Sequence, residues 1–85
     1  MLQQKADRLH ILYVDDEPDI REIAAAALSL DTGLQVDTAS SGNDALDRLR
    51  QGDIDLVLLD VMMPEMDGLT TLSKMKSDSS TRDIA

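Results

Sequence analysis

Cysteine is absent from this chain of 85 residues, and Tyr13 is its single aromatic residue. Without cysteine the chain can form no disulfide, no thiolate nucleophile and no zinc–sulfur site. With one aromatic ring, its core must consist of aliphatic side chains and methionine. No apolar run approaches the roughly 20 residues of a membrane span. We therefore expect no association with a membrane.

Basic residues are scarce, with 8 against 17 acidic ones and a formal net charge of −9. Such a surface is a poor partner for nucleic acid, so direct nucleic-acid binding is not expected. Cations and basic patches on other proteins suit it better. Hydrophobic residues make up 42% of the chain, which argues against disorder. The length allows one small domain, and the lack of cysteine and of an apolar signal segment is consistent with a cytoplasmic location.

The pattern of apolar residues predicts strands and helices in alternation. Strands are expected where short apolar segments are bounded by charge or turn residues, at residues 9–14, 34–39 and 54–59. Helices are expected where apolar residues recur at helical spacing, beginning near Pro18, Ser41 and Asp67, the first two ending at Gly33 and Gly52. Residues 1–8 are polar and are expected to be a leader outside the domain, which spans residues 9–85. Ile84 can begin a further strand.

This β-α-β-α-β-α order predicts an α/β fold with a parallel sheet and right-handed crossovers. The first strand is followed by Asp15 and Asp16, and the third ends at Asp60. Parallel strands end at the same edge of a sheet, where open α/β folds bind their ligands. The three carboxylates are therefore expected to converge, and such a cluster repels itself unless a cation is present.

Carboxylate oxygens of this kind suit Mg²⁺, which prefers a few oxygen ligands and keeps several waters. Asp16, Asp60 and one backbone carbonyl just after Asp60 would suffice, with Asp15 holding a coordinated water. Asp60 is then placed to act as a nucleophile. Carboxylates can form aspartyl phosphates, and a metal offsets the charge of the incoming phosphoryl group.

Three segments carry a family resemblance: ILYVDDEP at residues 11–18, DLVLLDVMMP at residues 55–64, and MDG at residues 66–68. In this order and spacing, the chain resembles the receiver domains of two-component response regulators. The resemblance implies a flavodoxin-like three-layer fold, here an incomplete β-α-β-α-β-α with the parallel sheet order 2-1-3.

The resemblance also implies a role for each residue of the acidic cluster. Asp60 matches the phosphoacceptor, Asp16 the direct metal ligand, and Asp15 the residue that reaches Mg²⁺ through water. Met62 matches the position whose backbone carbonyl binds Mg²⁺. The implied partner is a sensor histidine kinase or a phosphotransfer protein that donates the phosphoryl group from a phosphohistidine. Such a domain is not an enzyme in the ordinary sense, although it helps to catalyse its own phosphorylation.

Family members continue with two more strands, which end in a Thr or Ser and in a Lys that contact the phosphoryl group. Residues 1–85 match only the N-terminal part of such a domain and contain neither residue, so weak phosphorylation is expected. Residues 54–59 would then form an apolar sheet edge, which is prone to pairing. We expect a homodimer through this edge, an exchange of elements between two copies, or poor folding.

Other interpretations remain open. The chain can be a structural or protein-interaction α/β module, or a metal-dependent phosphohydrolase of another family. The latter is weakened by Met62, because such enzymes commonly carry a second acid there. Asp15 and Asp16 can also cap the first helix. The default expectations for the remaining candidates are structural: His10 as a partly satisfied strand residue, Tyr13 as packing, and Asp67 as a helix cap.

Overall fold

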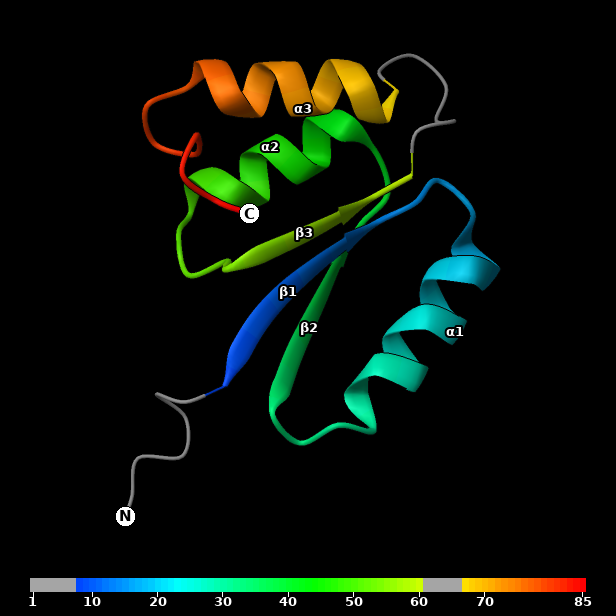
Figure 1. Ribbon diagram of the computed structural model, residues 1–85. Coiled ribbons are helices and arrows are strands. Elements are labelled where there is room, and N and C mark those ends of the chain that lie inside the picture. Colours follow the sequence, from blue (N-terminus) through cyan, green and yellow to red (C-terminus); the bar gives the residue numbers. More distant parts are fainter. Residues whose placement is uncertain (1–7, 61–66) are drawn as a thin grey trace.

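The computed structural model describes residues 8–60 and 67–85. It contains the strands β1 (Leu9–Val14), β2 (Leu34–Ala39) and β3 (Leu56–Leu59), and the helices α1 (Pro18–Ser29), α2 (Gly42–Arg50) and α3 (Gly68–Ser77). The strands are parallel and lie in the order β2-β1-β3. Helix α1 covers one face of the sheet, and α2 and α3 lie on the other (Figure 1). The expected alternation and the sheet order 2-1-3 are confirmed.

The expected leader, residues 1–8, lies almost wholly outside the described residues. Within the described part of the chain, no helix is both long and apolar enough to cross a bilayer.

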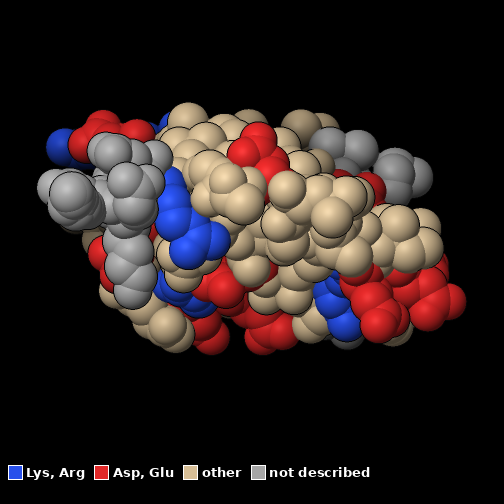
Figure 2. Space-filling view, turned by 90° about the horizontal axis from the view of Figure 1, so that it is seen from below, with Lys and Arg blue, Asp and Glu red and all other residues tan. Residues whose placement is uncertain are grey.

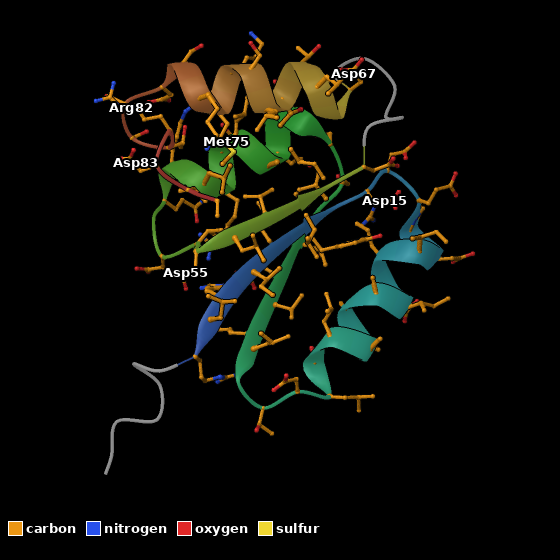
Figure 3. The ribbon with its side chains drawn as sticks, viewed as in Figure 1. Asp15, Asp55, Asp67, Met75, Arg82 and Asp83 are labelled. Carbon is orange, nitrogen blue, oxygen red and sulfur yellow. The ribbon has the colours of Figure 1, made fainter. Side chains whose placement is uncertain are left out.

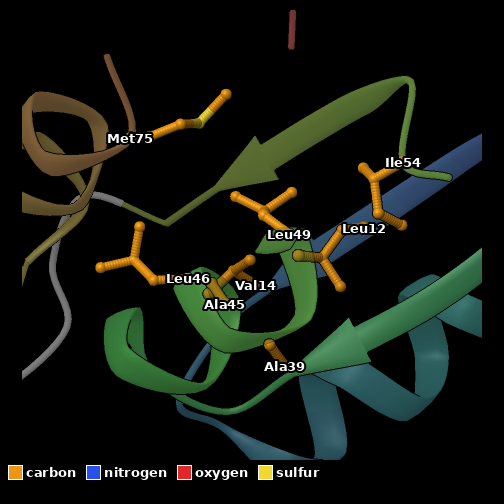
Figure 4. Packing of buried hydrophobic residues seen from close by; sticks show 8 residues of the cluster. All are labelled: Leu12, Val14, Ala39, Ala45, Leu46, Leu49, Ile54 and Met75. Atoms are coloured by element: carbon orange, nitrogen blue, oxygen red, sulfur yellow. The ribbon is translucent and has the colours of Figure 1, made fainter. Parts of the chain in front are cut away.

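The core lies between the sheet and helices α2 and α3. Figure 4 shows how its side chains point toward one another from strands and helices. The cluster consists of Leu12, Val14, Ala39, Ala45, Leu46, Leu49, Ile54 and Met75. Every member is aliphatic or methionine, as the scarcity of aromatic residues requires.

Several other apolar helix positions stay exposed. Ile20 and Ile23 of α1 are 45% and 67% exposed, and α1 has no buried residue. On α3, Met75 enters the core while Leu69 remains 67% exposed. Helical spacing therefore predicted these helices, but burial depends on what is packed against each face.

Most of the predicted helix ends are confirmed by their hydrogen bonds. The Ser41 hydroxyl accepts the N–H of Asp44 at the start of α2 (3.0 Å). After α2, Gly52 adopts φ +93°, which favours glycine, and its N–H donates to Leu49 O. The end of α1 differs from the prediction, because the helix stops at Ser29 rather than near Gly33.

Two strand predictions need correction. β3 begins at Leu56 rather than at residue 54, because the Asp55 carboxylate, and not a backbone carbonyl, accepts the N–H of His10 (2.8 Å). Ile84 does not begin a strand among the described residues. The chain nevertheless lies along β3 at its C-terminus, where Val57 N–H donates to Ala85 O (2.9 Å).

One charged cluster ties β1, β2 and α2 together, away from the acidic strand ends. His10 Nε2 and Arg48 Nη2 each lie 2.8 Å from Asp37 Oδ2. Burial raises the pKa of Asp37, but the hydrogen bonds and charges of Arg48 and His10 outweigh it and hold that pKa below its usual range. His10 is therefore a structural residue, as expected.

The Asp37 cluster predicts a specific response to acid. Because the folded-state pKa of Asp37 lies below the usual pKa of an aspartate, the ionised carboxylate stabilises the fold above that usual pKa and loses this effect as the pH falls through the folded pKa. Asp37→Asn should lower the urea unfolding midpoint at neutral pH, modestly because the side chain is 39% exposed. The difference in midpoint from the wild type should narrow below about pH 4, the usual pKa of an aspartate. A difference in unfolding midpoint that stays constant in acid would contradict this prediction. Asp83→Asn is the control.

Candidate functional site

Three carboxylates meet at one edge of the sheet. Asp15 and Asp16 follow β1, and Asp60 follows β3. One carboxylate oxygen from each lies within 4.8 Å of the other two. The strand register causes this approach, because Val14 pairs with Leu59 and Asp60 N–H donates to Val14 O (3.0 Å). The expected convergence of these residues is thus present in the structure.

Asp15 is the buried member of the cluster and is held from several directions. Its side chain points toward the region between the sheet and α1, at the opposite end of the sheet from Asp55 (Figure 3). The residue is 7% exposed. Oδ2 accepts the Tyr13 hydroxyl (3.2 Å), and Oδ1 accepts the N–H of Glu17 (3.0 Å). The backbone carbonyl of Asp15 accepts Arg21 Nη1 (2.9 Å).

The sequence interpretation missed Tyr13 and Arg21. Tyr13 was assigned to packing, yet its hydroxyl reaches the acidic cluster. The available signal was its separation from Asp15, because residues two apart in extended chain point to the same side. Partial burial, the hydrogen bond to Asp15 and the negative charges of Asp15 and Asp60 all raise the pKa of the Tyr13 phenol. The phenol therefore stays protonated at neutral pH and remains a donor.

The alternative that Asp15 and Asp16 cap the N-terminus of α1 is wrong. The residue at the N-cap of α1 is Glu17, whose side chain makes no capping hydrogen bond, and Pro18 occupies the first turn. Asp15 instead accepts the N–H of Glu17, just before the helix. Asp67 is a helix cap as expected, since its Oδ1 accepts Thr70 N–H (2.8 Å), a bond that lowers the pKa of Asp67.

The cluster fits a small divalent cation. Mg²⁺ binds oxygen ligands at about 2.0–2.1 Å in an octahedron, so its ligand oxygens lie roughly 3–4 Å apart. A spread of at most 4.8 Å among Asp15, Asp16 and Asp60 needs little closure to reach this arrangement. The mutual repulsion of three carboxylates favours a cation between them. The fourth candidate, the backbone carbonyl of Met62, lies outside the described residues.

Residues 11–85 match the family model of the response regulator receiver domain. The chain belongs to this family. The resemblance carried by the sequence motifs is therefore confirmed. The fold agrees as well. The structure of chemotaxis protein CheY4 of Vibrio cholerae, 31% identical, matches it with a TM-score of 0.80 over 88% of this chain and 62% of that one.

Similar proteins and similar solved structures agree with this family assignment. Response regulator SaeR of Staphylococcus epidermidis is 45% identical over 67 residues, which cover 79% of this chain and 28% of SaeR. The N-terminal domain of a receiver protein from Methanoculleus marisnigri JR1 is 45% identical with a TM-score of 0.83, covering 88% of this chain and 60% of that one. TrrA of Thermotoga maritima, solved with Mg²⁺-BeF, is 39% identical with a TM-score of 0.76, covering 84% of this chain and 61% of TrrA. TrrA has also been solved with the histidine kinase ThkA.

This receiver domain thus spans less than a third of SaeR and less than two thirds of the solved receiver chains. The comparisons identify it as a signalling module of the two-component type. One relative, a protein-glutamate methylesterase/glutaminase of Dechloromonas aromatica, is an enzyme, but the 77 aligned residues cover 21% of its length.

Proposed function

We propose that this receiver domain accepts a phosphoryl group on Asp60, with Mg²⁺ bound by Asp16, Asp60 and the Met62 carbonyl and, through water, by Asp15. The observation that carries the proposal is the convergence of three carboxylates at the ends of two adjacent parallel strands. The complex of the relative TrrA with Mg²⁺-BeF supports it.

The chemistry follows from the positions of these groups. An oxygen of Asp60 attacks the phosphorus of a phosphohistidine, so that an O–P bond forms while the N–P bond breaks. The histidine nitrogen leaves with the electron pair of that bond. When bound, Mg²⁺ offsets the negative charge that builds up between Asp60 and the phosphoryl oxygens. Asp16 supplies a carboxylate oxygen on the same edge, and Asp15 is held in place by its hydrogen bonds.

The proposed donor is a sensor histidine kinase or a phosphotransfer protein, as the complex of TrrA with ThkA supports. We place this signalling in the cytoplasm. Acidic side chains cover more of the face in Figure 2 than basic ones do, in line with the net charge of −9. This sign favours a partner with a basic surface over direct binding to nucleic acid.

Two further proposals concern the chain as a whole. We propose that it turns over no separate substrate and so is not an enzyme in the ordinary sense. We also propose that the outer edge of β3 can pair with a second copy. Val57 N–H of that edge donates to the Ala85 carbonyl of the same chain, so pairing with a second copy would have to displace this contact or use the rest of the edge.

A titration with Mg²⁺ tests the metal part of the proposed function. Amide resonances around Asp15, Asp16 and Asp60 should shift with millimolar Mg²⁺ (roughly the range of weak, solvent-exposed sites), while those around Asp83 should not. Asp16→Asn should weaken the response, because it removes a charge and an oxygen ligand, and Asp83→Asn should leave it unchanged. A chain that shows no response to Mg²⁺ would favour the structural alternative instead.

A further inference from the structure

We propose that Tyr13 is a positioning residue for the Mg²⁺ site: its hydroxyl holds the Asp15 carboxylate in the orientation from which Asp15 serves the metal. The inference rests on the proposed function, because it assigns a support to one of the residues proposed to surround Mg²⁺. It adds a role for a side chain that is not itself a metal ligand.

The two oxygens of Asp15 each have a donor. The Tyr13 hydroxyl donates to Oδ2 (3.2 Å), and the N–H of Glu17 donates to Oδ1 (3.0 Å). Two donors on opposite oxygens fix the rotation of a carboxylate about its last bond. Arg21 Nη1 also binds the Asp15 carbonyl (2.9 Å), so the backbone that carries the carboxylate is fixed as well. Of these donors to the carboxylate, only Tyr13 can be removed by a side-chain substitution.

Packing alone does not account for a tyrosine at this position. Tyr13 lies on β1, where its neighbours Leu12 and Val14 are fully buried aliphatic residues of the core on the other side of the strand. A phenylalanine or leucine would fill the space of the ring equally well. The hydroxyl adds one specific contact, and that contact is with a member of the acidic cluster.

Orientation of this kind has a measurable effect on metal affinity. Hydrogen-bond partners of metal ligands commonly change affinity by about 10–100-fold when they are removed. Asp15 is proposed to reach Mg²⁺ through water, and the loss of its support should therefore lie at the lower end of that range. A carboxylate held by one donor instead of two must be ordered further when the metal binds, which lowers the affinity.

Tyr13 also provides a spectroscopic signal. It is the only aromatic residue of the chain, so all of the protein's aromatic emission comes from it. A carboxylate that accepts a phenol's hydrogen bond quenches the emission of that phenol. If Mg²⁺ binding involves the Asp15 carboxylate, it should therefore change the emission of Tyr13.

The decisive experiment measures the affinity for Mg²⁺ by calorimetry in the wild type, Tyr13→Phe, Asp15→Asn and the double variant. Tyr13→Phe keeps the ring and should weaken Mg²⁺ binding by about ten-fold, with little change in the urea unfolding midpoint. In the Asp15→Asn background the same substitution should have no further effect, because the group that it positions has been removed. The Mg²⁺-dependent change in tyrosine emission should disappear in Asp15→Asn.

The possible outcomes separate the inference from the proposed function. If the wild type binds Mg²⁺ and Tyr13→Phe binds it equally well, the positioning role is overturned and the proposed metal site stands. An equal loss in the wild-type and Asp15→Asn backgrounds would also overturn it, since the effect would not act through Asp15. If the wild type binds no Mg²⁺, the proposed metal site fails and the inference fails with it.

Discussion

Replacing Asp60 by asparagine is expected to abolish the uptake of a phosphoryl group from a small donor such as acetyl phosphate. An amide cannot form the acyl phosphate, and the substitution also removes one of the three charges that favour Mg²⁺ in the cluster. Intact mass should show a phosphoryl adduct in the wild type and none in Asp60→Asn.

Asp83→Asn is the matched control, since Asp83 is an exposed acid in the C-terminal segment (Figure 3). It should retain the adduct of the wild type. Transfer to Asp60→Asn would show that another carboxylate is the acceptor. Absence of any adduct in the wild type would count against phosphoryl transfer to Asp60.

Leu12→Ala is expected to destabilise the fold more than a substitution of an exposed side chain. Leu12 is fully buried at the centre of the sheet, and it belongs to the core cluster with Leu49 and Ile54. Truncating a buried leucine costs about 2–5 kcal/mol. The whole stability of a domain this size is roughly 4–13 kcal/mol, at about 0.05–0.15 kcal/mol per residue. The free energy of unfolding, measured by urea denaturation with circular dichroism, should therefore fall by a large fraction of its total.

Leu30→Ala is the control for this substitution. Leu30 follows α1 and is 85% exposed, so the same change of side chain there should alter the free energy of unfolding by less than about 0.5 kcal/mol. Equal losses in the two variants would mean that the core is not centred on Leu12.

The elements of the fold could be predicted because each leaves a local pattern. Apolar segments bounded by charge marked the strands, and Ser41, Asp67 and Gly52 marked helix ends through hydrogen bonds to near neighbours. The errors arose where a distant residue intervened. β3 starts late because the side chain of Asp55 pairs with the backbone of His10, a contact between residues far apart in sequence.

The residues of the candidate site likewise fall into those that the sequence could predict and those that it could not. Asp15, Asp16 and Asp60 could be named because each follows a predicted strand, and parallel strands end together. Tyr13 and Arg21 could not be assigned, because their contacts with Asp15 depend on the rotamers of long side chains and on the angle between α1 and the sheet. Met62 keeps its proposed role from the family motif alone.

The sequence by itself determined the family, the alternation of strands and helices and the residues of the acidic cluster, because motifs and periodicity are local properties of the chain. The order of the strands in the sheet was expected from the family resemblance. Only the tertiary structure decided which apolar side chains are buried and which groups support Asp15. Burial of Met75 but not of Leu69 depends on which face of α3 meets the core. The hydrogen bond from Tyr13 to Asp15 likewise depends on the placement of two side chains in space. Their separation of two residues places both on the same side of the extended chain, but it does not specify the contact.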